Sequence, residues 1–234
     1  MPEGEPEASG TRTLDCVAGP LAPTDGAIVR GVELADLARL YDPDVMLVTA
    51  PIPPSPEALL HASTLAEAGL RHSQVKVETP DEVPFAGQLD GLAGVGGEHA
   101  EAWTAYLEEV TGVFASLVGA RVVGVRQVVS DGPHCPRFHV DKILARGVLN
   151  VIGGRTEWLD EADVDRTRLG HAGGPDDATS GLVRPGSRLG RAESGTLAVF
   201  KGTAWPGAAE RAVVHRSPPA DGGLRVLLTL DWLD

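Results

Sequence analysis

The sequence predicts an α+β fold in which a first half with helices supports an antiparallel β barrel or sandwich in the second half. Apolar side chains recur at three- and four-residue steps between residues 98 and 118, a pattern typical of an amphipathic helix. From residue 121 onward, short β-branched and apolar runs are separated by irregular connections, which is typical of an antiparallel barrel or sandwich. We therefore expect residues 13–234 to form a single domain, with residues 13–120 as a support region and residues 121–234 as the β core.

The first half begins with a segment that lacks an apolar anchor. Residues 1–12 are rich in Pro, Glu and Gly, so we expect them to form a disordered tail. The apolar run at residues 45–48 indicates a buried strand, and residues 71–77 favour another. Ser55 is placed to cap a helix whose first turn contains Pro56. These elements supply the support region that the fold class requires.

The helix between residues 98 and 118 is the clearest element of the first half, and Gly119 lies where it should end. The second half contains six expected strands, at residues 121–129, 138–141, 145–152, 195–200, 211–215 and 225–232. A long connection at residues 160–194, crowded with Gly, Asp and Arg, separates the third of these strands from the fourth. A connection of this length in a compact domain is typical of a lid or an insertion.

The composition limits the class of partner. Asp and Glu number 33 against 20 Lys and Arg, a formal net charge of −13 on 234 residues. Such a surface repels phosphate backbones and anionic lipids, which argues against nucleic acid and membrane as partners. Two cysteines do not make a disulfide framework, and neither a secretion signal nor a membrane-spanning apolar run is present. We expect a cytoplasmic protein that acts on a small molecule or a protein.

The most informative motif is His139-x-Asp141, which lies in the run CPRFHVDK. Side chains two positions apart on a strand point to the same face, so an imidazole and a carboxylate meet there. His215 would complete a set of two imidazoles and one carboxylate, which holds one face of a non-haem Fe(II) and leaves the other positions open. The same ligands suit Zn(II), an alternative that His134 and Cys135 strengthen, although a turn with Cys135 as a small buried hydrophobe also explains that pair. Without a metal, the motif is a polar pair on a strand surface.

Arg225 follows His215 by ten residues. The segment between them, at residues 217–223, is rich in turn-forming residues, so we expect two neighbouring antiparallel strands joined by a turn. A guanidinium near the metal would grip a carboxylate through two parallel hydrogen bonds. An ion pair with an acidic neighbour on the sheet is the alternative role for Arg225.

The order H-x-D, then a distant H, then an R about ten residues later resembles the Fe(II)/2-oxoglutarate-dependent oxygenase superfamily. Five blocks resemble, more specifically, an uncharacterised bacterial family, domain of unknown function 1826: CPRFHVDK, GRTEWL, KGTAWPG, VVHRSPP and LLTLDWL. The resemblance covers the chain from about residue 40 to its end. It implies a double-stranded β-helix, which is a jelly-roll or cupin-like barrel, with supporting N-terminal helices.

The resemblance also implies roles for particular residues. The Fe(II) ligands would be His139, Asp141 and His215. Arg225 would hold the distal carboxylate of 2-oxoglutarate. Many such oxygenases carry a hydroxyl residue two positions after this arginine, where the chain has Leu227. Thr229, two residues further on the same strand face, is the nearest hydroxyl and the second candidate for the co-substrate.

Three further residues are candidates for a substrate pocket. Trp158 and Trp205 lie in blocks flanked by Gly or Pro, where each could line a pocket or belong to the core. Glu157, beside Trp158, is a candidate contact to the substrate. The function expected from these residues is that of a mononuclear non-haem Fe(II) oxygenase dependent on 2-oxoglutarate. The alternatives are a cupin-like zinc-binding protein of metal homeostasis and a barrel that has lost its metal.

Overall fold

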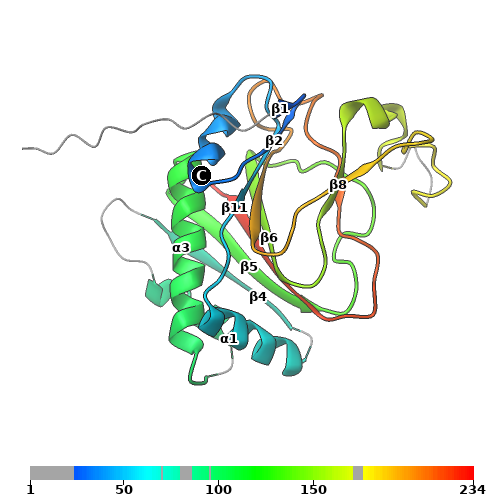
Figure 1. Ribbon diagram of the computed structural model, residues 1–234. Coiled ribbons are helices and arrows are strands. Elements are labelled where there is room, and N and C mark those ends of the chain that lie inside the picture. The colour runs from blue at the N-terminus through cyan, green and yellow to red at the C-terminus, as the bar shows by residue number, and fades with distance from the viewer. Residues whose placement is uncertain (1–23, 70, 80–85, 95, 171–175) are drawn as a thin grey trace, which may run out of the picture.

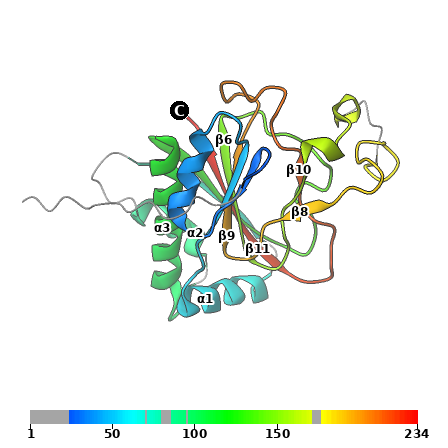
Figure 2. The same ribbon diagram turned by 45° about the horizontal axis from the view of Figure 1, so that its top comes forward.

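The structure, a computed structural model, describes residues 24–69, 71–79, 86–94, 96–170 and 176–234. These residues form layers. Helices cover one face of a large sheet, and a smaller sheet lies against its other face (Figures 1 and 2). The predicted disordered tail at residues 1–12 lies outside the described residues.

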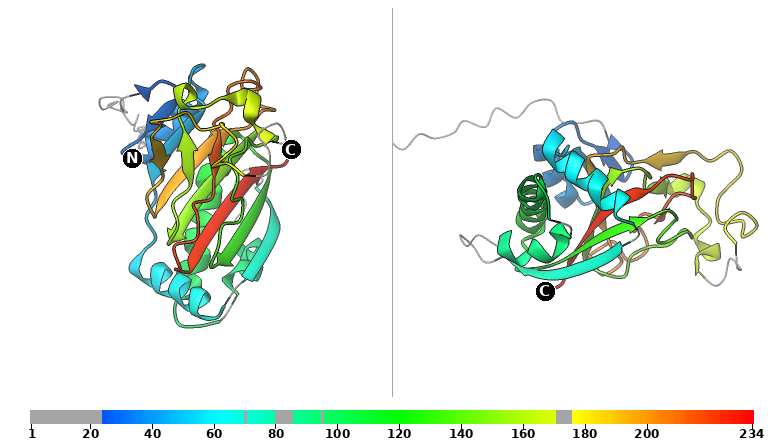
Figure 3. Two further views of the ribbon diagram at one scale, coloured as in Figure 1. Left: turned by 90° about the vertical axis from the view of Figure 1, so that its right-hand side faces the viewer. Right: turned by 90° about the horizontal axis from the view of Figure 1, so that it is seen from below.

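The larger sheet has eight strands in the order β1-β2-β3-β9-β6-β11-β5-β4. Its strands are β1 Thr24–Asp25, β2 Ile28–Arg30, β3 Leu47–Pro51, β4 Arg71–Glu78, β5 Val122–Ser130, β6 Ala145–Ile152, β9 Thr196–Lys201 and β11 Arg225–Trp232. Neighbouring strands are antiparallel except β2 and β3, which are parallel. Strand β11, red in the left view of Figure 3, lies between β6 and β5. The sheet takes strands from both sides of residue 120. The predicted support region and the predicted β core therefore both contribute strands to it.

The smaller sheet has three strands in the order β10-β7-β8. They are β7 Glu157–Leu159, β8 Leu189–Arg191 and β10 His215–Arg216. An isolated backbone pair between His139 and His215 adds one residue to its edge. Trp158 of β7 belongs to the same apolar cluster as Phe200 and Leu227 of the larger sheet. The two sheets therefore share a core between them.

The helices of the described residues are α1 Pro56–Glu67, α2 Asp90–Ala93 and α3 Ala100–Val118, with 3-10 helices η1 Leu34–Tyr41, η2 Ala86–Gln88, η3 Glu161–Asp163 and η4 Arg166–Arg168. Ser55 caps α1 as predicted, because its hydroxyl accepts a hydrogen bond from the Ala58 amide at 3.1 Å. Helix α3 ends at Gly119, whose φ of 69° lies in the left-handed region that glycine adopts without strain. Both predicted helices are confirmed. Among the described helices, none combines the length and the apolar character needed to cross a membrane.

The face of the larger sheet that α1 and α3 cover is apolar. Val226, Leu228 and Leu230 of β11 are buried in one cluster with Phe114 of α3. A Cβ at Gly147 of β6 would lie 3.1 Å from the Phe114 ring, so the missing side chain lets α3 pack closely on the sheet. This face supplies the largest part of the buried apolar surface and therefore most of the hydrophobic stabilisation.

The described part of the connection at residues 160–194 packs on the outer side of the smaller sheet. Leu159 points away from Trp158 because side chains alternate along β7. On that outer side lies a separate apolar cluster: Phe138, Leu159, Val164, Leu182 and Val214. The described part of the connection contains η3, η4 and β8, so it is more structured than the loop that the sequence predicted.

Two of the predicted strands are shorter than expected. Of residues 138–141, only His139 makes a sheet pair, through its bridge to His215. Residues 211–215 contribute only their last residue, His215, to β10. The two metal-site segments are therefore short and irregular rather than extended strands.

His215 and Arg225 do not lie on neighbouring strands, contrary to the prediction. Strand β10 belongs to the smaller sheet and β11 to the larger one. Pro218 and Pro219, in the connection between them, have no backbone N–H and do not donate to a ladder of a hairpin. The chain instead crosses from one sheet to the other, so that His215 and Arg225 face the same interior from opposite sides.

Candidate metal centre

The three predicted metal ligands come together between the two sheets. One ligand atom each from His139, Asp141 and His215 lies within 4.8 Å of the others, and Nε2 of His215 is 3.4 Å from Oδ2 of Asp141. Two backbone hydrogen bonds, at 3.0 and 2.9 Å, tie His139 to His215. Bonds of about 2.0–2.2 Å to one metal ion place neighbouring ligands about 3 Å apart, so small side-chain rotations close the site around an ion.

Backbone carbonyl groups orient both imidazole rings. Nδ1 of His139 is 2.9 Å from the carbonyl oxygen of Arg137, and Nδ1 of His215 is 3.1 Å from that of Val213. A carbonyl oxygen only accepts, so Nδ1 is the nitrogen that carries the hydrogen in each ring. The lone pair is then on Nε2, which is the arrangement that metal-binding histidines show when their second nitrogen is fixed by an outer partner.

Only one of the two carboxylate oxygens of Asp141 has a hydrogen-bond partner among the described residues. Oδ1 accepts a hydrogen bond from Nη1 of Arg146 at 2.5 Å. Oδ2 is buried and has no hydrogen-bond partner in the described part of the chain. A buried carboxylate oxygen without a partner is costly, and a divalent cation would satisfy it. Together with two Nε2 lone pairs, this orphaned oxygen shows that the residues fit a metal ion.

The electrostatic surroundings favour the protonation states that a metal requires. Burial lowers the pKa of His139, and the charge of His215 acts in the same direction. Burial by itself raises the pKa of Asp141, but the neighbouring His215 imidazole and the charge of Arg146 outweigh it, so the pKa is lowered. A neutral imidazole and an ionised carboxylate are the forms that bind metal ions.

The backbone around Asp141 is held by the turn that follows β9. The amide of Gly202 donates to the carbonyl of Leu144 at 2.8 Å, and the amide of Thr203 donates to that of Asp141 at 2.8 Å. A Cβ at Gly202 would overlap the carbonyl oxygen of Ile143. Gly202, the first glycine of the KGTAWPG block, therefore allows the segment that carries Asp141 to approach β9 closely.

Arg146 and Asp231 form an outer layer that the sequence analysis did not single out. Nε and Nη2 of Arg146 donate to the two carboxylate oxygens of Asp231 at 2.6 and 3.1 Å. This pair fixes the guanidinium that holds Oδ1 of Asp141. The available signal was a charged residue within each of the otherwise apolar strands at residues 145–152 and 225–232.

Arg225 is a buried cation without a carboxylate partner among the described residues. It is 3% exposed and donates only long hydrogen bonds, at 3.3 and 3.4 Å, to the carbonyls of Pro218 and Pro219. Its Nε has no hydrogen-bond partner, and neither has the buried hydroxyl of Thr229 on the same strand face. The alternative role for Arg225, an ion pair on the sheet, has no partner in the described part of the chain.

A small cavity of about 50 Å³ lies beside the triad. Its wall includes His139 and His215 and, from the larger sheet, Arg126, Leu227 and Thr229. This volume holds a few water molecules. A ligand as large as 2-oxoglutarate therefore needs the side chains of the wall to move apart.

The three residues predicted for a substrate pocket do not line this cavity. Both carboxylate oxygens of Glu157 are taken, by Arg191 at 2.8 Å and by Arg216 at 3.0 Å. Trp158 is 1% exposed in the core between the sheets. Trp205 packs against other aromatic rings at the opposite end of β11. Contact between these side chains and a substrate stays a prediction.

The zinc alternative drew on His134 and Cys135, which both line the cavity. Neither belongs to the group of converging ligand atoms within the described residues. The ring of His134 instead lies 5.8 Å from that of His72. Burial raises the pKa of Cys135, which favours the neutral thiol over a metal-binding thiolate.

Comparison with known proteins adds a family and a fold. A family model described as "Protein of unknown function (DUF1826)" matches residues 31–231. The search of curated proteins found no match. Among solved structures, the chain is similar to the dioxygenase for auxin oxidation in rice, with a TM-score of 0.51 and 14% identity, covering 89% of this chain and 83% of that one.

Two further solved structures are similar. The 2-oxoglutarate complex of dioxygenase for auxin oxidation 1 from Arabidopsis thaliana gives a TM-score of 0.50 and 11% identity, covering 88% of this chain and 91% of that one. A prolyl-4-hydroxylase from Pseudomonas putida gives a TM-score of 0.42 and 14% identity, covering 85% of this chain and 97% of that one. The likeness to the rice and Arabidopsis structures confirms the predicted fold class, an α+β fold built on a double-stranded β-helix with supporting helices. At these identities it establishes the fold and not the activity.

Proposed function

The chain belongs to the DUF1826 family, and we propose that it is a mononuclear non-haem Fe(II) oxygenase that uses 2-oxoglutarate. One observation carries the proposal: free ligand atoms of His139, Asp141 and His215 converge in the interior of a double-stranded β-helix. Two neutral imidazoles and one carboxylate are the ligand set of such iron centres, and they leave half of the coordination sphere open. Structures of the same fold include dioxygenases, one of them in complex with 2-oxoglutarate.

The composition of the ligand set is compatible with the proposed iron centre. A thiolate ligand would favour zinc. Cys135 lines the cavity, yet its sulfur is outside the converging group and its burial disfavours the thiolate. The set that remains has only nitrogen and oxygen donors, which suits Fe(II).

Arg225 and Thr229 support 2-oxoglutarate as the co-substrate. The buried guanidinium lacks a carboxylate partner among the described residues, and a free carboxylate of the ligand would supply one through charge-assisted hydrogen bonds. Thr229 lines the cavity, and its unpartnered hydroxyl would donate to the same ligand. Leu227, between them on the strand, offers no hydrogen bond, so Thr229 takes the place of the hydroxyl that many such oxygenases have at that position.

Each part of the chain then has a role in the reaction. Bound Fe(II) would supply the activation of O₂ that is coupled to oxidative decarboxylation of the 2-oxo acid. Arg146 holds Oδ1 of Asp141 and leaves Oδ2 available to a metal ion, and Arg225 would orient the co-substrate. Val148 and Leu227, apolar residues of the cavity wall, exclude water from the reacting groups.

The test is turnover of 2-oxoglutarate by protein that has been purified without oxygen and loaded with Fe(II). The expected result is slow formation of succinate in air that requires Fe(II), with ascorbate added as the two-electron reductant in place of an oxidisable substrate. The variant Arg225→Met should keep its iron and form succinate only at higher 2-oxoglutarate concentration. Stoichiometric zinc with no succinate formed after replacement by Fe(II) would overturn the proposal in favour of a zinc-binding protein, and absence of any bound metal would indicate a barrel that has lost it.

A further inference from the structure

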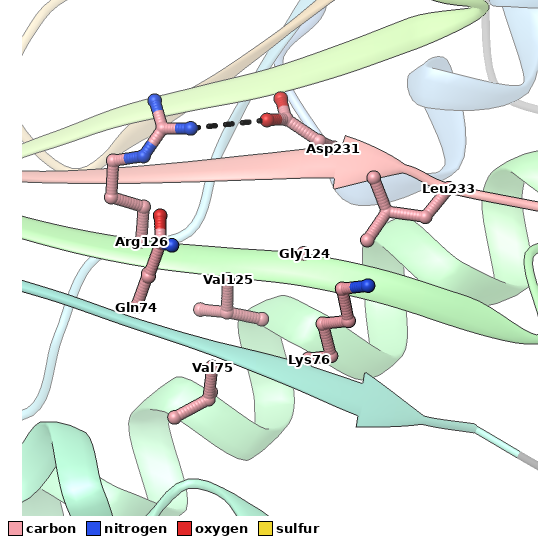
Figure 4. A pocket seen from close by; sticks show the side chains of 8 residues that line it. All are labelled: Gln74, Val75, Lys76, Gly124, Val125, Arg126, Asp231 and Leu233. Carbon is pink, nitrogen blue, oxygen red and sulfur yellow. Dashed lines mark ion pairs between the residues drawn. The ribbon is translucent and has the colours of Figure 1, made fainter.

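A second polar depression lies on the open face of the larger sheet, next to the metal centre. It has a volume of about 270 Å³ and is shown in Figure 4. Its polar lining comes from Gln74 and Lys76 of β4, Arg126 of β5 and Asp231 of β11. Nothing in the proposed role of the triad accounts for it.

The register of the strands explains how these side chains meet. Lys76 is paired with Gly124 and Gly124 with Asp231, while Gln74 is paired with Arg126. Paired residues of neighbouring strands point to the same face, so these side chains surround the position of Gly124. Gly124 has no side chain between Lys76 and Asp231, and the position that a Cβ would take lies 3.1 Å from the side chain of Leu233, which also lines the depression (Figure 4).

The depression offers positively charged donors that the described residues use only in part. Arg146 takes both carboxylate oxygens of Asp231 through hydrogen bonds, so Nη2 of Arg126 reaches Asp231 only at 3.6 Å. Nε of Arg126 is buried without a hydrogen-bond partner. Lys76 is exposed and has no ion pair within the described ranges. Asp231 is thus paired with both arginines, and Lys76 forms no ion pair with it.

Arg126 also connects the depression to the metal centre, because it lines both the depression and the cavity beside the triad. Strand β4 is separated from β6, which carries Arg146, by β5 and β11. Three strand spacings of about 4.8 Å make this a distance of roughly 14 Å across the sheet. A small molecule shorter than this distance, with one end in the depression, would extend its other end toward the triad.

We propose that this depression binds an anionic group of the substrate, a carboxylate or a phosphate, through Lys76, Arg126 and the amide of Gln74. This inference rests on the proposed oxygenase function and names its substrate class: a small molecule with an anionic group at one end and an oxidisable carbon at the other. The unpartnered Nε of Arg126 is a donor for a charge-assisted hydrogen bond to the anion, and Lys76 adds a second positive charge at the rim.

The test uses the full-length, metal-free protein, labelled with ¹⁵N, with phenyl phosphate and phenylacetate as separate probes. We expect saturable shifts of the backbone amide signals of Gln74, Lys76 and Gly124. Tighter binding of phenyl phosphate assigns the site to phosphate, and tighter binding of phenylacetate assigns it to carboxylate. Shifts that do not saturate, or that avoid these three amides, overturn the proposal.

Two variants distinguish a defined anion-binding site from non-specific attraction of the probe to positive charge. Lys76→Gln removes one exposed charge and should weaken binding up to about fivefold. The matched control is Arg168→Gln, which changes the net charge equally at an exposed position on η4 and should leave binding unchanged. Equal weakening in both variants would contradict a defined site.

This experiment and the test of the oxygenase function fail independently. Binding of the anion in the metal-free protein requires neither Fe(II) nor 2-oxoglutarate. Saturable anion binding without succinate formation would therefore keep the anion site and reject the oxygenase. Succinate formation without anion binding would keep the oxygenase and reject an anionic substrate.

Discussion

The two faces of the larger sheet show opposite ways of using the same strands. Along β11, Val226, Leu228 and Leu230 face the helices within a continuous apolar cluster. The alternate residues, among them Arg225 and Thr229, face the smaller sheet and are also buried. Burying polar groups without partners costs free energy, whereas burying apolar ones is favourable. One face is therefore built for stability, and the other carries polar groups whose cost a ligand would offset.

The largest effect should follow from a change on the helix-covered face. Phe114→Ala removes a fully buried ring that packs on Gly147, and the free energy of unfolding should fall by about 3–5 kcal/mol. Urea unfolding followed by circular dichroism measures it. Leu60→Ala, at a position that is 55% exposed on α1, is the matched control and should change stability by less than about 0.5 kcal/mol. Equal losses in the two variants would contradict the assignment of Phe114 to the stabilising core of the helix-covered face.

On the opposite face, Arg146→Met should act on metal binding more than on folding. Without the guanidinium, Oδ1 of Asp141 loses its partner and the carboxylate is free to rotate. Loss of an outer-layer partner typically costs about 10–100-fold in metal affinity, and we expect a loss of this size for Fe(II) under anaerobic titration. Arg146→Lys should recover part of the affinity, because it restores one charged donor. An unchanged affinity in the Met variant would show that Arg146 does not position the ligand.

The variant Arg225→Met should weaken the binding of 2-oxoglutarate without lowering the free energy of unfolding. Charge-assisted hydrogen bonds are worth about 1.5–3 kcal/mol, so the dissociation constant of 2-oxoglutarate should rise about 10–100-fold while bound Fe(II) is unchanged. Because the guanidinium is buried without a carboxylate among the described residues, its removal should leave the free energy of unfolding unchanged or higher. Isothermal titration calorimetry and urea unfolding measure the two quantities. A clear loss of stability with unchanged 2-oxoglutarate binding would assign Arg225 a structural role instead.

The smallest expected effect is that of Thr229→Val, a change of similar shape that removes one hydroxyl. The hydroxyl is buried without a partner, so the unfolding free energy should stay the same or rise slightly. Loss of a single hydrogen bond of about 0.5–1.5 kcal/mol should weaken 2-oxoglutarate binding about two- to tenfold. Titration calorimetry beside the Arg225→Met variant compares the two contributions directly, and no weakening would remove Thr229 from the co-substrate site.

Local patterns were sufficient to predict most elements. The apolar pattern at residues 98–118 corresponds to α3, Ala100–Val118, and Ser55 caps the start of α1. The predicted strands 145–152 and 225–232 match β6 and β11. In each case the signal, hydrophobic periodicity or a helix cap, lies in residues that are close in the sequence. Contacts between distant residues were therefore not needed to predict these elements.

The placement of strands in sheets could not be predicted in the same way. The turn residues between His215 and Arg225 indicated a hairpin, but the chain crosses to the other sheet there. Arg146 and Asp231 were missed because their partnership joins strands that are 85 residues apart in sequence. Pairings of this kind depend on the whole topology, whereas His139 and Asp141 were found because they are neighbours in the sequence.

The most direct test of the central claim, that the polar face holds a metal ion, is the metal content of the purified protein after anaerobic loading with Fe(II) and removal of excess metal. We expect one iron per chain in the wild-type protein and in His99→Ala, a control histidine at the start of α3 outside the triad. His139→Ala and His215→Ala should each lose the iron while remaining folded. Stoichiometric iron in both of these variants would contradict the assignment of the metal centre.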